Sequence, residues 1–275
     1  MIFKAQAFTK ASKSYNEDGY YKKHPVYFVA DGATGLYPKN KSNHISDASK
    51  MVRFLTEKFD DFYNGDFKET LYNISKAYQK IENFNTNNSA AKPSAGIAAI
   101  VERKDAFYAY LLGDCEIVTV TRNNIAKRYV NKELKKLDEK ALDKMQYYTR
   151  INNLVTAEEK RAAIKPILIK HRNMMNRPNG YNVFTIDDNP DFYIREIVIP
   201  KNNIKTIYLY TDGFAQIFDT IRSYYRGYKK VFSNSLNPEE IINLINNNWN
   251  RDYNLQKYPR FKQKDDITVL KLHLK

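Results

Sequence analysis

Short strand-like runs that follow one another with little helix between them most constrain the fold of this chain. Residues 96–101, 106–112 and 117–121 are rich in β-branched and aromatic side chains, and only charged or Gly-Asp turns separate them. Strands joined by such short connections pair in antiparallel fashion. The middle of the chain is therefore predicted to form a β-meander.

The rest of the chain alternates between single strands and pairs of helices. Strands are predicted at residues 2–9, 26–30, 192–199, 206–210 and 267–274. Apolar residues at helical spacing predict three helices, from Asp47 to Gly65, from Leu71 to Ile81, and over residues 238–250. Ser46 is the predicted N-cap of the first. Residues 131–149 and 157–175 are rich in Lys, Glu and Leu and predict a helical hairpin. This hairpin either takes part in partner selection or only covers the sheets.

This order of elements predicts helices outside two stacked, mainly antiparallel sheets. The chain has 275 residues and no Gly/Ser-rich or Pro-rich tract that reads as a linker. We therefore expect residues 1–275 to form a single domain, with a helical excursion or flap at about residues 131–180.

The composition narrows the class of protein. The only cysteine, Cys115, cannot form an internal disulfide, and the chain opens without an apolar signal-peptide segment and offers no membrane-spanning run. A cytoplasmic protein without a membrane partner is expected. The net charge of +14 attracts phosphates, acidic proteins or nucleic acid, but no nucleic-acid-binding signature accompanies it. A solvated basic surface is the preferred interpretation, and nucleic-acid binding is the weakest of three functional hypotheses.

Acidic residues gather where strand-like runs meet turns. The clusters are Glu17-Asp18, Asp31-Gly32, Asp212-Gly213 and Asp265-Asp266. A strand end is a rigid platform for a carboxylate, and Mg²⁺ and Mn²⁺ prefer such oxygen ligands. Taken alone, each Asp-Gly pair is more often a turn than a ligand. Their occurrence together, in order along the chain, raises the case for a metal site.

Five segments in order resemble the successive motifs of the metal-dependent, type 2C-like (PPM) protein phosphatases, in a bacterial-type variant. They are Lys13-Ser14-Tyr15-Asn16-Glu17-Asp18, Val29-Ala30-Asp31-Gly32-Ala33-Thr34-Gly35, Gly113-Asp114, Tyr210-Thr211-Asp212-Gly213-Phe214 and Asp265-Asp266-Ile267-Thr268-Val269. No single motif is specific, but the resemblance runs from residue 13 to residue 269. It implies an α+β fold, a four-layer α-β-β-α sandwich.

The resemblance also implies the roles of individual residues. Asp31 would bridge two Mn²⁺ or Mg²⁺ ions, and Asp18, the Gly32 carbonyl, Asp212 and Asp265 would complete their ligands. Glu17 would act through bound water. Asp114 would help to hold a third, weaker ion, with a simple turn between two strands as an equal alternative. Lys13 would bind the substrate phosphate.

The implied activity is hydrolysis of phosphoserine or phosphothreonine in proteins, with Asp31, Asp212 and Lys13 as catalytic residues and water or hydroxide between the two ions as nucleophile. The partners would be a phosphorylated protein and a cognate Ser/Thr kinase. Two departures weaken the pattern: many members carry Arg at the Lys13 position, and eukaryotic members carry His at Ala33. The alternative is a catalytically weak or inactive pseudophosphatase that acts as a regulatory binding module.

Overall fold

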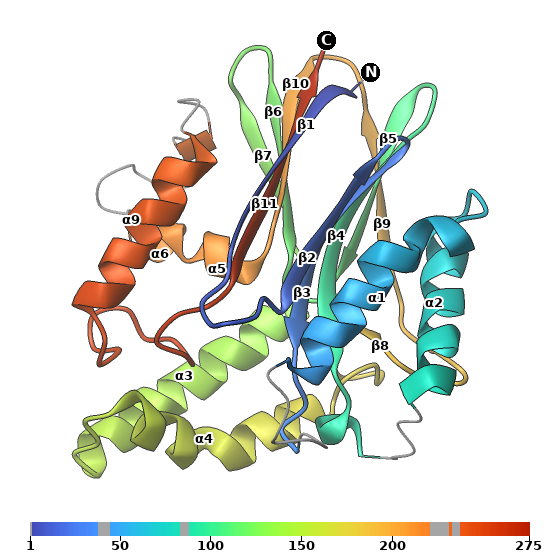
Figure 1. Cartoon of the computed structure of the whole chain (residues 1–275). Helices are drawn as coiled ribbons and strands as arrows, with labels where there is room; N and C mark the ends of the chain where they lie inside the picture. Colours follow the sequence, from blue (N-terminus) through green and yellow to red (C-terminus); the bar gives the residue numbers. More distant parts are fainter. Residues whose placement is uncertain (1, 38–44, 83–87, 221–230, 233–236) are drawn as a thin grey trace.

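The computed structural model describes residues 2–37, 45–82, 88–220, 231–232 and 237–275, and its centre is a pair of stacked sheets (Figure 1). Sheet A has five strands in the order β1-β11-β10-β6-β7. Its strands are β1 (Ile2–Lys10), β6 (Glu116–Thr121), β7 (Ala126–Tyr129), β10 (Ile204–Tyr210) and β11 (Ile267–Leu274). Every pairing in it is antiparallel, which confirms the prediction from the short connections.

Sheet B has the order β2-β3-β4-β5-β9, with the short strand β8 paired to β4. Its strands are β2 (Asp18–Lys23), β3 (Val26–Ala33), β4 (Ser94–Glu102), β5 (Ala106–Leu112), β8 (Phe184–Thr185) and β9 (Arg195–Pro200). Apolar residues of both inner faces fill the space between the sheets, among them Val29, Ile100, Leu209 and Leu270.

Helices cover the outer faces of both sheets, so the four-layer α-β-β-α prediction is confirmed (Figure 1). On sheet B lie α1 (Asp47–Phe62) and α2 (Phe67–Glu82), whose apolar faces join the aromatic cluster around Phe28 and Phe59. A 3-10 turn, η1 (Ser89–Ala91), follows α2 in the described part of the chain. On sheet A lie α5 (Asp212–Ala215), α6 (Ile217–Thr220) and α9 (Pro238–Arg251).

The predicted helical hairpin is present as α3 (Glu133–Ile151) and α4 (Ala157–Arg172), and it lies across one end of the sandwich (Figure 1). It ends earlier than predicted, at Arg172 instead of residue 175, because Asn173 closes α4 and a turn follows. Helix α3 buries only Ala141 and Met145. A small apolar cluster of Met175, Tyr181 and Val183 packs beside its first turns.

Several strands also differ from the sequence prediction. Residues 10–25, expected as a loop, contain β2, whose Tyr20 and Tyr21 alternate between the faces of sheet B in a segment too polar to read as a strand. The strand predicted at residues 192–199 is β9, Arg195–Pro200, because Phe192 and Ile194 pack on the α2 side before the pairing begins. Strands β7 and β8 were too short to be predicted. None of the described helices is long and apolar enough to cross a membrane.

Candidate metal centre

Three of the predicted carboxylates meet at one end of the sandwich because their strands end there. Asp18 begins β2 and lies directly opposite Asp31 on β3. Asp212 follows β10 of the other sheet, and its backbone N–H donates to Oδ2 of Asp31 at 3.2 Å. The Thr211 hydroxyl donates to Oδ2 of Asp18 at 2.8 Å. Strands of both sheets thus direct acidic side chains toward one place.

The turn between β5 and β6 brings Asp114 to the same place. Gly113 has a φ of +64°, a left-handed conformation that glycine adopts without strain. A Cβ added at Gly96 would lie 2.7 Å from Oδ1 of Asp114, so this carboxylate packs directly on the backbone of β4. Ligand atoms of Asp31, Asp114 and Cys115 all lie within 4.8 Å of one another.

The two acidic residues before β11 differ in their contacts. Asp265 accepts a hydrogen bond from Nζ of Lys262 at 2.8 Å. Asp266 is buried and accepts from the backbone N–H groups of Ser12 at 2.6 Å and Glu17 at 2.7 Å. Asp266 therefore fastens the segment before β2, and Asp265 is the one of the pair that faces the other carboxylates.

Glu17 and Gly32 form a tight contact beside Asp31. The Gly32 N–H donates to the Glu17 carbonyl at 3.1 Å, and a Cβ at Gly32 would lie 2.4 Å from that oxygen. Only glycine fits there. The Glu17 carboxylate accepts from the hydroxyl of Ser46 at 2.7 Å and from that of Thr34. Ser46 also caps α1 as predicted, so the first turn of this helix is tied to the acidic end of the sheets.

The carboxylates repel one another in a setting that is buried at Asp18 and half-buried at Asp31, Asp114 and Asp212. Burial, followed by the charges of Asp212, Asp18 and Asp114, holds the pKa of Asp31 well above its usual range. Burial and the charge of Asp265 raise the pKa of Asp212 to about 7, and burial likewise raises the pKa of Asp114 to about 6. The pKa of Asp18 is raised for the same reasons, burial first. Such a cluster requires protons or cations to be stable.

One lysine contacts this cluster directly. Burial by itself lowers the pKa of Lys262, but the charges of Asp265 and Asp212 outweigh that effect and raise it. Lys262 is therefore an ammonium ion held by the acidic group. A single ammonium leaves most of the negative charge of this cluster uncompensated.

The donor set fits divalent cations. Mg²⁺ and Mn²⁺ bind carboxylate and carbonyl oxygens, and in two-ion sites the ions lie about 3.5–4 Å apart, so ligands on opposite ions need not lie within one small sphere. Asp18, Asp31, Asp114, Asp212 and Asp265 supply such oxygens. Burial raises the pKa of the Cys115 thiol well above its usual value, and the side chain belongs to the core between the sheets. Cys115 is thus a packing residue.

The helical hairpin adds charged groups that the sequence did not reveal. Burial, then the charges of Asp114 and Asp212, raises the pKa of Asp138 on α3 well above its usual range. Arg161 on α4 has its pKa lowered by burial, while the charges of Asp265 and Glu17 act in the opposite direction. Its Nη1 donates to the carbonyl of Phe261 at 3.0 Å. Helical spacing alone could not tell which of the many charged residues of α3 and α4 face the sheets.

Arg172, the last residue of α4, ties the hairpin to the Asp31 strand. Its guanidinium donates to the carbonyls of Ala33 at 2.8 Å and Thr34 at 2.9 Å, and to the Ser94 hydroxyl at 2.8 Å. Its Nε is buried without a hydrogen-bond partner among the described residues. Arg172 therefore fixes the end of α4 against the backbone just after Asp31 and Gly32.

Lys13, predicted to bind phosphate, is exposed and lies away from the hydrogen bonds of the cluster. Its ammonium is 5.4 Å from the ring centroid of Tyr15, a cation–π contact of modest strength at an exposed site. The neighbouring Ser12 N–H is held by Asp266. Lys13 thus stands on a segment that is anchored beside the carboxylates, with an exposed side chain.

Comparison with known proteins places the fold among bacterial phosphatases. No family model and no curated protein matches the sequence. Among solved structures, the serine/threonine phosphatase Stp1 from Staphylococcus aureus matches with a TM-score of 0.57 and 11% identity, covering 100% of this chain and 96% of that one.

Two further solved structures agree. The Mycobacterium tuberculosis serine/threonine phosphatase PstP/Ppp matches with a TM-score of 0.53 and 13% identity, covering 100% of both chains. PppA, described as a key regulatory component of T6SS in Pseudomonas aeruginosa, matches with a TM-score of 0.55 and 11% identity, covering 99% of this chain and 98% of that one. These identities establish a common fold over the whole length of the chain.

Proposed function

We propose that this chain, which has the fold of the bacterial PPM-type serine/threonine phosphatases, is itself a metal-dependent phosphatase that hydrolyses phosphoserine or phosphothreonine in proteins. One observation carries the proposal. Carboxylates from the ends of strands in both sheets converge in a largely half-buried cluster, with raised pKa values, and Lys262 is the one lysine among the described residues that forms a hydrogen bond with them. Selection for stability alone does not favour such a cluster, because it costs free energy in the absence of cations.

Asp31 is the residue best placed to contact two ions, because its carboxylate lies between Asp18 on its own sheet and Asp212 on the other. We assign Asp18, the Gly32 carbonyl, Asp212 and Asp265 as the remaining ligands of a pair of Mn²⁺ or Mg²⁺ ions. Asp114 is assigned to a third, weaker ion. Glu17, held by two hydroxyl groups, is assigned to orient water at the rim of this site.

Bound divalent cations would lower the pKa of a water molecule and neutralise the phosphoryl oxygens of the substrate. The protein's part is to position groups around the phosphate. Arg161 projects from α4 toward Asp265 and Glu17, and its guanidinium can grip phosphate oxygens with two parallel hydrogen bonds. We assign this role to Arg161 together with Lys13, whose flexible ammonium gives a less selective contact.

The departure at Ala33 fits the same scheme. Ala33 is followed by Thr34, and Arg172 holds the carbonyls of both residues. Because the Ala33 side chain has no proton to donate, we assign protonation of the leaving group to water at the site. A cytoplasmic location and action opposite a Ser/Thr kinase complete the proposal.

The test is release of phosphate from a phosphothreonine peptide by the purified protein with Mn²⁺, with Mg²⁺ and with EDTA. We expect turnover with either cation, none with EDTA, and none from Asp31→Ala protein that retains a native circular dichroism spectrum. If folded, Mn²⁺-saturated protein binds the peptide and releases no phosphate, the phosphatase is ruled out and the regulatory binding module takes its place.

A further inference from the structure

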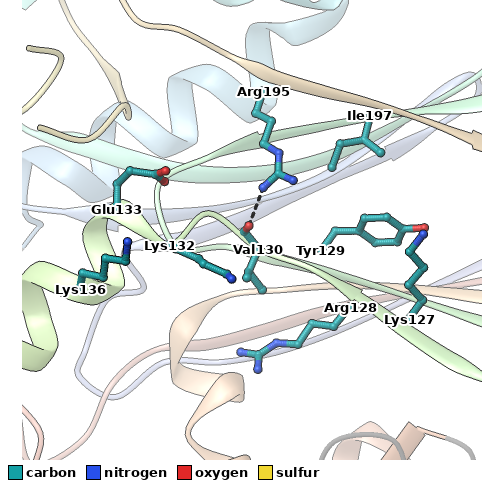
Figure 2. Close-up of a pocket in the computed structure, with 9 residues that line it drawn as sticks. All are labelled: Lys127, Arg128, Tyr129, Val130, Lys132, Glu133, Lys136, Arg195 and Ile197. Carbon is teal, nitrogen blue, oxygen red and sulfur yellow. Dashed lines mark hydrogen bonds between the residues drawn. The ribbon is translucent and has the colours of Figure 1, made fainter. Parts of the chain in front are cut away.

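A basic groove opens at the side of the sandwich, outside the metal centre. It has a volume of about 630 Å³, and its lining includes Lys127, Tyr129, Lys132, Glu133, Lys136 and Arg195. In Figure 2, Arg195 reaches across it to the Val130 carbonyl, with Glu133 and Lys136 at one end and Lys127 and Tyr129 at the other. The Arg195 hydrogen bond to Val130 is 2.7 Å long and joins the two walls.

The two walls are the edges of the two sheets. Strand β7 is the last strand of sheet A and β9 the last strand of sheet B. Within the described residues, neither strand has a partner on its outer side. The groove therefore runs beside two strand edges that no described strand covers, and such edges can pair with an extended segment.

The charge of this basic groove is strongly one-sided. Five of its lining residues are cations, and Glu133 is the one carboxylate. Arg128 is neutralised by Glu116, through a 2.6 Å hydrogen bond from its Nε and a second contact from Nη2. Lys127, Lys132, Lys136 and Arg195 form no ion pair with any described residue. An anionic ligand would meet four cations that no described carboxylate pairs with.

The strand pairings place the groove close to the candidate metal centre. Arg195 is opposite Leu111 on β5, and Tyr129 is opposite Ile117 on β6. Both of these partners are three residues from Asp114 in the connecting turn. One strand spacing of about 4.8 Å and three residues at no more than about 3.3 Å each put the groove within roughly 11 Å of that carboxylate. An extended peptide covers that distance in about three or four residues.

We propose that the basic groove binds acidic residues of the phosphoprotein substrate, located three or four positions from the phosphorylated serine or threonine. This inference rests on the proposed phosphatase function and names the substrate class, a phosphorylated segment flanked by Asp, Glu or a second phosphate. Lysines and arginines attract such side chains at long range and orient them on arrival.

Nucleic acid fits the groove less well. Single strands bind to rows of aromatic faces, and Tyr129 is the one aromatic residue of the lining. Its ring is already covered by the ammonium of Lys127, 5.1 Å from the centroid. The free edges of β7 and β9 instead suit a polypeptide backbone.

The test compares charge reversal in the groove with charge reversal outside it. Lys132→Glu with Lys136→Glu removes two cations of the groove, and Lys135→Glu with Lys140→Glu makes the same change on exposed positions of α3 outside it. Two phosphothreonine peptides are compared. One carries Glu at the third and fourth positions before and after the phosphothreonine, and the other carries Ala at the same positions. The readout is kcat/KM for the Glu peptide divided by kcat/KM for the Ala peptide.

We expect the unmodified protein to favour the acidic peptide about fivefold to tenfold, as a few exposed ion pairs allow. The Lys132→Glu/Lys136→Glu protein should lose this preference through KM, and the Lys135→Glu/Lys140→Glu protein should keep it. Equal use of both peptides by the unmodified protein, or equal loss in both variants, would overturn the inference.

A binding arm separates failure of this inference from failure of the phosphatase assignment. A fluorescein-labelled, Glu-rich peptide without phosphate is titrated with Mn²⁺-loaded protein by fluorescence anisotropy, with single-stranded DNA as competitor. Saturable binding that the Lys132→Glu/Lys136→Glu change weakens supports the groove even if no phosphate ester is hydrolysed. Displacement by DNA at a lower concentration than by unlabelled peptide would contradict it in favour of nucleic acid.

Discussion

The sandwich and the α3–α4 hairpin both contribute to the candidate metal centre, but they are built very differently. Strand β4, beside Asp31, is buried along its whole length, whereas α3 buries two of its 19 residues. Regions with few buried apolar contacts open locally at lower free energy than the core does. The sheets therefore provide rigid candidate ligands, and the hairpin adds Asp138 and Arg161 from a cover that is held less firmly.

The largest loss of activity is expected from substitutions of the carboxylates on the sheets. Asp31→Asn or Asp212→Asn should lower kcat/KM for a phosphothreonine peptide about 10³-fold or more, since each lost ligand removes several kcal/mol of charge stabilisation. The matched control is Asp105→Asn, an exposed carboxylate in the β4–β5 turn. Steady-state rates with Mn²⁺ check this, and activity within tenfold of the unmodified protein would remove these residues from the site.

A substitution on the α3–α4 hairpin should have a smaller effect, on the affinity for Mn²⁺. Asp138→Asn removes a carboxyl group near Asp114 and Asp212 without breaking any described hydrogen bond. Mn²⁺ affinity should fall about tenfold, as is typical when a group that supports the ligands without binding the metal is lost. Isothermal titration with Mn²⁺ measures it. Asp143→Asn, exposed on the same helix, should leave the affinity unchanged, and equal effects of the two changes would deny Asp138 its role.

Removal of metal should make the stability of the protein depend on pH, because the carboxylates at the ends of the sheets repel one another. Burial raises the pKa of Asp212 to about 7 and that of Asp114 to about 6, so the folded protein keeps protons that the unfolded chain has released. Stability of the metal-free protein must then fall as pH rises from about 4 to about 7.

The expected loss is at least about 1.4 kcal/mol, equivalent to one unit of pKa. Thermal unfolding in EDTA at several pH values measures it, and saturating Mn²⁺ should remove most of the dependence. A metal-free protein that becomes more stable over this pH range would show that the carboxylates are compensated in some other way.

The smallest effect concerns the attachment of the hairpin. Thr156 caps α4 in a capping box with Glu159, and Thr156→Ala should destabilise that helix by about 1 kcal/mol. Hydrogen exchange of the α4 amides should speed up about fivefold with little change in the global melting temperature. Ser46→Ala, the matched change at the α1 cap, should instead lower global stability, since Ser46 also binds Glu17. Identical responses would mean that both helices belong to one cooperative unit.

The same contrast explains what the sequence could predict. Asp31 and Asp212 were recognisable because apolar runs end directly before them, and strand ends leave little choice of direction. Asp18 and Asp265 were assigned through the resemblance of their segments to phosphatase motifs. Asp138 could not be recognised, since the face of a polar helix depends on how the hairpin docks onto the sandwich.

The basic groove was hidden for a related reason. Lys132 and Arg195 are far apart in the sequence and become neighbours only because β7 and β9 end the two sheets on the same side. The sequence indicated a solvated basic surface, without a place where the charge gathers. Polar β2 was missed because its pairing with β3, and not its own composition, makes it a strand.

The central claim is that the converging carboxylates hold two divalent cations. Its most direct test is a crystal of the protein grown with saturating Mn²⁺ and measured above the manganese absorption edge. The account predicts two strong anomalous peaks about 3.5–4 Å apart, both within bonding distance of Asp31 and one each beside Asp18 and Asp212. An ordered site without an anomalous peak at these carboxylates would contradict it.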